Sequence, residues 1–327
     1  MNSWKTDTAV LLIFFVRDDT FRHVFESVRA ARPRILLLWQ DGPRENRPDD
    51  PVGIQACREI AESIDWDCEV HRMYHDKNMG CDPSTFYAMR WAFTIVDKCI
   101  ILEDDQVPSA SFYTYCVELL DKYKHDERIS HINGHNYLGQ SDCGADYLFA
   151  YSGTGAWASW RRVAETWEGD YAFLNDDIAL DNVQTHYGKR SLPWIRTAQQ
   201  RKQTGLEYWE SIIGMGAAMQ SRYAIIPRIN LVKNIGVGSA GTHCSIDTYE
   251  ALPKKLREFY EMAAMELSFP LKHPRYVIAD ARYIKKMEER SKNSFWSSIS
   301  WRIEIMFNLL KLRKWKELAS LITKKLK

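Results

Sequence analysis

Short apolar runs and amphipathic stretches alternate along the N-terminal part of the chain. Three apolar runs are typical of strands that are buried on both faces: Val10–Val16, Ile35–Trp39 and Cys99–Leu102. Cys68–Met73 is predicted as a further strand. Between and after them, apolar residues at helical spacing predict helices: Thr20–Arg32, Gln55–Ile64, Ser84–Val96 and Phe112–Tyr123. Strands that alternate with helices indicate βαβ units. We therefore expect an α/β fold with a mostly parallel sheet and flanking helices.

Charged residues follow three of the predicted strands directly. They are Arg17-Asp18-Asp19, Gln40-Asp41 and Glu103-Asp104-Asp105. The carboxyl ends of parallel strands meet at one edge of a sheet, where such folds bind their ligands. The sequence therefore predicts a site at this edge that contains several carboxylates.

The run Glu103-Asp104-Asp105 has two interpretations. Adjacent carboxylates repel each other unless a cation compensates them, and Mg²⁺ or Mn²⁺ prefers carboxylate, phosphate and water oxygens. This favours a metal–diphosphate site. The alternative is a solvated acidic turn that precedes the helix Phe112–Tyr123. The sequence contains neither a P-loop nor a GxGxxG fingerprint.

The alternation of strands and helices fades after about residue 130. Small and aromatic residues mix over Ala150–Arg162, and short strands with glycine-rich turns are predicted over Ala224–Asn230 and Val232–Gly238. We expect one domain over residues 1–245, divided at about residue 130 into two halves. Residues 246–294 are predicted to form a helical linker region.

Composition narrows the class of protein. Apolar residues make up 45% of the 327 residues and charged residues 27%, which excludes a disordered or collagen-like chain. The net charge of +1 argues against a polycation that binds nucleic acid. Seven scattered cysteines without a CxxC pair argue against a zinc site or a disulfide framework, and favour the cytoplasm.

The last segment differs from the rest of the chain. Residues 295–327 contain eight basic and two acidic side chains, a net charge of +6. Apolar residues recur there at steps of three or four: Trp296, Ile299, Ile303, Phe307 and Leu310. This pattern predicts basic amphipathic helices and peripheral contact with the inner face of the cell membrane. The alternative is a helix that packs on the domain through the same apolar stripe.

Several motifs together resemble a known family. IILEDD, followed by QVP, is similar to the metal-binding segment of GT-A fold glycosyltransferases, in particular the N-acetylglucosaminyltransferase branch and its bacterial relatives. Other segments resemble the same family in the same order, over roughly residues 8–245: LLIFFVRDDTFRHVFESVRAARP, LLLWQDGPR, DKNMGCDPSTFYAMRWAF, AYSGTGAWASWRR and INLVKNIGVGSAGTH. The resemblance implies a Rossmann-like GT-A domain with a nucleotide-sugar half (about 1–130) and an acceptor half (about 131–245), followed by a C-terminal helical extension.

The resemblance also implies roles for the acidic strand end. Asp105 matches the residue that ligates the metal, Mn²⁺ or Mg²⁺, and His243 matches a histidine that completes the coordination. Asp104 matches the residue near the nucleotide ribose, and Glu103 the one that faces the donor sugar.

Further residues match the nucleotide-sugar site of the family. Asp41 matches an aspartate at the nucleotide base, and Arg17 lies where the first strand opens toward the nucleotide. Asn78 belongs to the loop that precedes the metal strand. Trp157 is expected to stack on a sugar face, with core packing as the alternative.

An inverting transferase needs a general base near the acceptor hydroxyl. The family places it in an aromatic-flanked segment, where Glu207 matches best and Glu210 second, with Asp176 and Asp177 as outside candidates. The bacterial relatives use aspartate here. Asp82 also departs from the family, where a basic residue commonly follows the cysteine.

These matches predict a metal-dependent inverting hexosyl- or N-acetylhexosaminyltransferase. Its donor would be a UDP-sugar, and its acceptor a glycan or polyprenyl-linked saccharide of a surface polysaccharide or glycoprotein glycan. Two alternatives stay open: a sugar-1-phosphate nucleotidyltransferase, and a non-catalytic carbohydrate- or membrane-binding protein on the same fold. No glycine-rich, basic loop follows the first strand, which argues against the nucleotidyltransferase.

Overall fold

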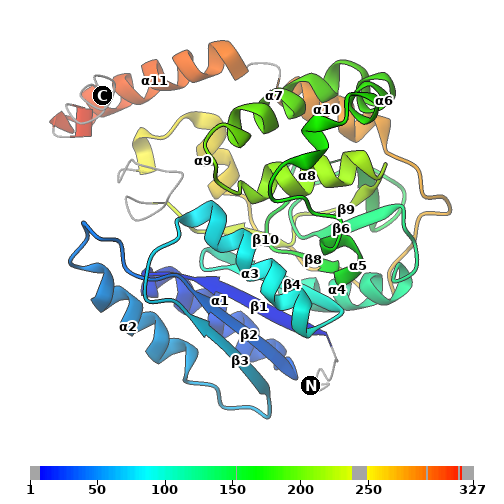
Figure 1. Cartoon of the computed structure of the whole chain (residues 1–327). Coiled ribbons are helices and arrows are strands. Elements are labelled where there is room, and N and C mark those ends of the chain that lie inside the picture. Colours follow the sequence, from blue (N-terminus) through cyan, green and yellow to red (C-terminus); the bar gives the residue numbers. More distant parts are fainter. Residues whose placement is uncertain (1–7, 152, 238–248, 292–293, 316, 319–327) are drawn as a thin grey trace.

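The computed structural model describes residues 8–151, 153–237, 249–291, 294–315 and 317–318. Its centre is an eight-stranded sheet with the strand order β3-β2-β1-β4-β8-β6-β9-β7 (Figure 1). In chain order the strands are β1 (Ala9–Phe14), β2 (Ile35–Gln40), β3 (Glu69–Tyr74), β4 (Lys98–Glu103), β6 (Ile129–Asn133), β7 (Tyr147–Ala150), β8 (Trp157–Trp160) and β9 (Tyr223–Pro227). A separate two-stranded sheet joins β5 (Gln106–Pro108) to β10 (Val232–Asn234).

The N-terminal half is doubly wound. β1 pairs in parallel with β2 and β4, and β2 pairs in parallel with β3. Helix α1 (Asp18–Ala31) packs beside α2 (Asp50–Ala61) and α4 (Ala110–Lys122), whereas α3 (Cys81–Ile95) contacts α5 (Arg161–Ala164) and α8 (Trp209–Met219). Because parallel crossovers are right-handed, the return from β3 to β4 puts α3 on the face opposite α1 and α2. The predicted α/β fold with flanking helices is confirmed.

Continuous apolar strands form the core of this half. Residues 10–12, 36–38 and 100–102 are all at most 1% exposed. Helices cover both faces of these strands, so neither face tolerates polar side chains. This is why the sequence shows unbroken apolar runs here instead of an alternation.

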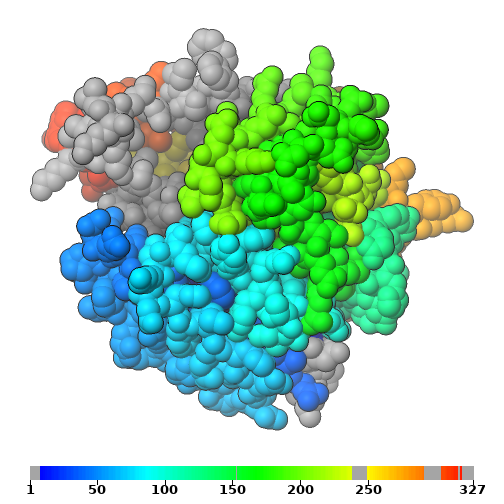
Figure 2. All heavy atoms as spheres, in the orientation of Figure 1, coloured from blue at the N-terminus to red at the C-terminus, as the bar shows by residue number. Residues whose placement is uncertain are grey.

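The C-terminal half joins the sheet through antiparallel strands. β8 lies antiparallel between β4 and β6, β6 pairs in parallel with β9, and β7 is antiparallel to β9. Helices α6 (Asp177–Tyr187), α7 (Ser191–Lys202) and α8 form a layer that the sequence did not predict. In the space-filling view, the green surface that includes α6 and α7 lies above the cyan surface that includes α3 (Figure 2).

A helical linker region is expected over residues 246–294. In the structure, residues of the segment 249–291 pack on the sheet of the domain. The backbone N–H of Asp280 donates to the carbonyl of Phe149 in β7, and Tyr283 of α10 (Ala281–Ser291) is buried against β7 and β9. α9 (Lys254–Tyr260) lies near β10. The chain then continues into α11 (Ser294–Lys311).

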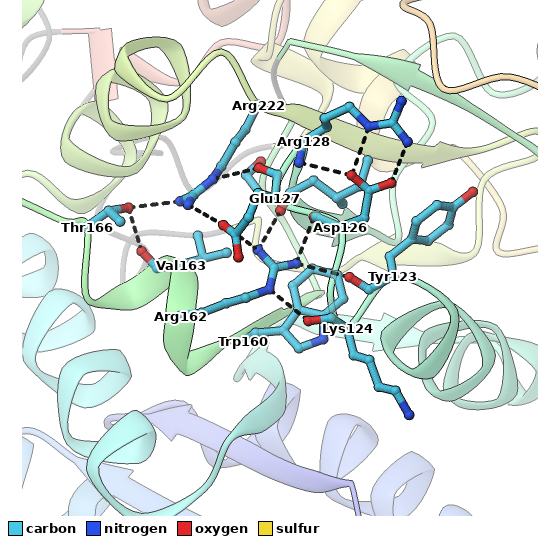
Figure 3. Close-up of polar contacts among 12 residues, drawn as sticks. Tyr123, Lys124, Asp126, Glu127, Arg128, Trp160, Arg162, Val163, Thr166 and Arg222 are labelled. Atoms are coloured by element: carbon cyan, nitrogen blue, oxygen red, sulfur yellow. Dashed lines mark hydrogen bonds and ion pairs between the residues drawn. The ribbon is translucent and has the colours of Figure 1, made fainter.

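A half-buried arginine of α5 connects the end of α4 to the segment that follows β8 (Figure 3). The Arg162 guanidinium donates to the carbonyls of Tyr123 and Lys124 at 3.0 Å each and to that of Asp126 at 3.1 Å. It also lies over the Trp160 ring, 4.6 Å from the centroid. Arg162, in the segment that resembles the transferase family, therefore satisfies carbonyls at and beyond the C-terminal end of α4.

None of the helices in the described ranges is long and apolar enough to cross a membrane.

Candidate active site

The carboxyl ends of β1 and β4 lie side by side. Glu103, the last residue of β4, is opposite Ile13 of β1. Arg17, three residues beyond β1, donates from its guanidinium to Asp104 and, at 3.0 Å, to Oδ2 of Asp105. The strand order reverses at β1, and such reversals are where α/β sheets bind ligands. The strand ends that the sequence predicts to meet do meet here.

This strand end carries more negative than positive charge. Three carboxylates follow one another, and Arg17 pairs with two of them, Asp104 and Asp105. Burial raises the pKa of Glu103, and the charges of Asp105, Glu210 and Asp104 raise it further. Burial also raises the pKa of Asp104, and the Arg17 charge offsets only part of that increase. Such an excess of carboxylate charge favours a bound cation.

Asp105 is held against the β10 segment. The backbone N–H of Ile235 donates to its carbonyl at 2.9 Å. A Cβ placed on Gly236 would lie 2.7 Å from Cγ of Asp105, so only glycine fits at this position. The backbone thus fixes where the carboxylate can point.

The residues of this strand end fit a hard divalent cation, because carboxylate oxygens are the ligands that Mg²⁺ and Mn²⁺ prefer. Within the described ranges, no three His, Cys, Asp or Glu side chains are grouped as a complete metal site. Asp105, at the end of this run, could hold such a cation. His243, the second expected ligand, lies outside the described residues.

Asp41 and Asn78 hold a loop at the edge of the site. The Asp41 carboxylate accepts from the backbone N–H groups of Gly42 and Met79 at 2.9 Å and of Gly80 at 3.2 Å, and from Asn78 Nδ2 at 3.0 Å. Burial raises the pKa of Asp41 despite these donors. Both residues line the cleft described next. Their polar contacts fix the loop that leads into α3.

A cleft of about 520 Å³ opens above these residues, and we call it the main cleft. Arg17 and the three carboxylates line it together with the N-terminus of α3, where Gly80, Cys81, Ser84 and Thr85 lie. Phe259 and Tyr260 of α9 also line it, far along the chain from the predicted site. No spacing or motif in the sequence connects these two aromatic residues to the acidic strand end.

A second cavity of about 260 Å³, the side cavity, lies next to the main cleft. Tyr151, Trp194 and Tyr208 contribute aromatic rings to it, and the Arg201 guanidinium lies 3.6 Å from the centroid of the Tyr208 ring. Glu210 lines both cavities. It is therefore a wall residue of both cavities.

The structure separates the two candidate bases. Glu210 lies in the first turn of α8, where the helix dipole favours negative charge. The Glu207 carboxylate instead accepts a hydrogen bond from the Tyr87 hydroxyl at 2.7 Å, and Glu207 belongs to neither cavity lining. Asp176, an outside candidate, caps α6 by accepting from the backbone N–H of Ala179.

Trp157 is a core residue. Its side chain is 1% exposed and stacks on Trp209 with ring centroids 6.3 Å apart and planes 7° apart. A ring buried to this degree offers no face to a sugar, so the structure places Trp157 in the alternative role of core packing. Through Trp209, which adjoins Glu210 and lines the main cleft, it supports the wall of the site.

Comparisons with known proteins show no family match and no similar curated protein. Among solved structures, a 4-diphosphocytidyl-2C-methyl-D-erythritol synthase from Anaerococcus prevotii is similar with a TM-score of 0.31 and 9% identity, over 53% of this chain and 78% of that one. A UDP-glucose pyrophosphorylase complexed with UDP-glucose is similar with a TM-score of 0.25 and 7% identity, over 49% of this chain and 71% of that one. At these scores the function has to be argued from the site of this chain itself.

Proposed function

We propose that this protein is a metal-dependent, inverting glycosyltransferase that uses a nucleotide-sugar donor, a UDP-sugar in the first instance. Its acceptor would be a glycan or lipid-linked saccharide of a surface polysaccharide or glycoprotein glycan. One observation carries the proposal. An acidic strand end paired with Arg17 lies in a cleft that shares a wall residue, Glu210, with a second, aromatic-lined cavity.

The main cleft suits the diphosphate of a donor. The N-terminus of α3 faces it, and helix N-termini favour anions through their free N–H groups and dipole. Arg17 adds a fixed positive charge beside the carboxylates. A Mn²⁺ or Mg²⁺ ion on Asp105 would stabilise the negative charge of the departing nucleoside diphosphate.

The side cavity suits the acceptor. Its aromatic rings can stack on apolar sugar faces, and its polar groups can bind hydroxyls. An acceptor hydroxyl beside Glu210 would attack the anomeric carbon of the donor sugar. The bond from that carbon to the diphosphate oxygen breaks, the nucleoside diphosphate leaves, and the Glu210 carboxylate takes the hydroxyl proton. Attack from the side opposite the leaving group inverts the anomeric configuration.

Product analysis distinguishes this proposal from its two alternatives. With Mn²⁺, we expect UDP release from a UDP-sugar, and NMR of the glycoside formed should show the inverted anomer. A nucleotidyltransferase would instead release pyrophosphate from UTP and a sugar 1-phosphate. A binding protein would bind ligand and form neither product. Pyrophosphate release, or binding without turnover across a panel of donors and acceptors, would contradict the proposal.

A further inference from the structure

Helix α11 has two apolar sides, and only one of them packs on the protein. Ile305 and the buried Leu309 contact a small cluster that includes Leu252 and Leu256. Figure 1 shows α11 beyond α9, at the edge of the molecule farthest from β3. The inner side therefore explains how the helix is attached to the domain.

The outer side is an exposed apolar stripe. Ile303, Met306, Phe307 and Leu310 are 61%, 36%, 66% and 44% exposed. Their spacing of three and four residues places them on one face of the helix. Trp315, just beyond the helix, is 62% exposed. We call the four helical residues the outer stripe.

Basic residues accompany this stripe. Lys311, Arg313 and Lys314 are exposed at the end of the helix. Glu304, the acidic residue within the stripe's length, accepts from the backbone N–H of Lys254 at the start of α9, so its carboxylate is engaged on the protein side. In the described residues, the end of the outer stripe is thus positively charged.

We propose that the outer stripe docks the protein on an anionic lipid surface, with its apolar side chains in the headgroup region and the basic residues on lipid phosphates. An apolar helical face with large aromatic residues beside lysine and arginine is the pattern of interfacial helices. Each cation near an anionic membrane strengthens binding by roughly fivefold. A second copy of this chain would bring a like-charged surface against the cations, which favours the lipid as the occupant.

Docking through α11 would also define the position of the main cleft relative to the membrane. The cluster under α11 includes Leu256 and Tyr260 of α9, and Tyr260 lines the cleft. The helix proposed to lie on the membrane thus shares a hydrophobic cluster with a wall residue of the candidate active site. If the proposed function holds, this arrangement favours an acceptor carried on a lipid. The docking itself does not depend on that function.

Vesicle flotation of the full chain tests the docking without any enzymatic readout. We expect binding to vesicles that contain phosphatidylglycerol, weak binding to pure phosphatidylcholine, and a decrease with added salt. The double variant Ile303→Ser/Phe307→Ser should bind at least tenfold more weakly. Ile178→Ser, at a 77% exposed position of α6, is the matched control and should bind like wild type. Both altered side chains are exposed, so the fold should persist, as circular dichroism can check.

Two outcomes would overturn the proposal. One is equal binding of the wild type and the double variant to anionic vesicles. The other is a wild type that does not bind the vesicles and is a dimer by light scattering, while the double variant is a monomer. The outer stripe would then be an interface between two copies of the chain. A wild type that binds vesicles but shows no transferase activity would count against the proposed function. It would still support the docking proposal.

Discussion

Gly236 lies directly against the carboxylate of Asp105. A Cβ at residue 236 would be 2.7 Å from Cγ and 3.0 Å from Cβ of Asp105, which is closer than side-chain atoms approach. Residue 236, just after β10, therefore has to be glycine for Asp105 to keep its position. This contact joins the two-stranded sheet of β5 and β10 to the acidic strand end.

The substitution Gly236→Ala should move Asp105 without removing its charge. We expect Mn²⁺-dependent nucleotide affinity to fall at least tenfold, about 1.4 kcal/mol. Gly214→Ala is the matched control, because no atom lies within 4 Å of its Cβ position in α8. It should leave affinity unchanged. Calorimetry measures both variants, and an unchanged affinity in Gly236→Ala would show that the position of Asp105 does not matter for binding.

Glu210 and Glu207 should differ sharply in turnover. Removal of a general base costs about 10²- to 10⁴-fold in rate. Glu210→Gln should therefore lower kcat by this range and keep the donor affinity, since the charge acts on the acceptor hydroxyl. Glu207→Gln removes a contact to Tyr87 and should change kcat by only a few-fold. The reverse ranking would assign the base to Glu207 and contradict the geometric argument.

A buried histidine should make stability depend on pH. His131 is 4% exposed, and its burial lowers its pKa to about 4. In the unfolded chain the His131 side chain binds a proton near pH 6.5. Protonation therefore favours the unfolded state as the pH falls from 6.5 toward 4. Relative to His131→Gln, the wild type should lose about 2 kcal/mol of unfolding free energy between pH 7 and pH 5. Urea unfolding at both values measures the difference. A difference that does not change with pH would mean that folding leaves the pKa of His131 unchanged.

Arg162 should stabilise the fold and leave the chemistry alone. Arg162→Ala leaves the carbonyls of Tyr123, Lys124 and Asp126 without this donor, which we expect to cost about 1–3 kcal/mol of unfolding free energy. Arg162→Lys should not restore this stability, because one ammonium group cannot donate to the same set of separated carbonyls as the planar guanidinium. Chemical denaturation gives both values, and nucleotide binding in the cold should match wild type. Full stability in either variant would contradict this role.

The sequence predicted the parallel half of the sheet well and the helical layer poorly. Leu36–Leu38 and Ile100–Leu102 are buried on both faces of the sheet. Burial on both faces requires an unbroken run of apolar residues, which can be recognised in the sequence. α8 contains Gly214 and Gly216, which lower its intrinsic helix propensity. It forms because Ile212 and Ile213 pack into the core. Tertiary packing of this kind leaves no local signal.

The candidate site divides in the same way. The meeting of Arg17 with Asp104 follows from strand order, and strand order follows from the βαβ pattern. Phe259 reaches the main cleft through packing of a distant segment, which spacing cannot reveal. The choice between Glu207 and Glu210 required the position at which α8 begins.

Calorimetric titration of UDP with and without Mn²⁺, on wild type and Asp105→Asn, tests the central claim most directly. Asparagine keeps the shape of the side chain against Gly236 and removes its charge. The account predicts UDP binding that requires Mn²⁺ and falls at least tenfold in the variant, about 1.4 kcal/mol. If UDP, GDP, dTDP and CMP all fail to bind with or without the metal, the acidic strand end is not a metal–diphosphate site.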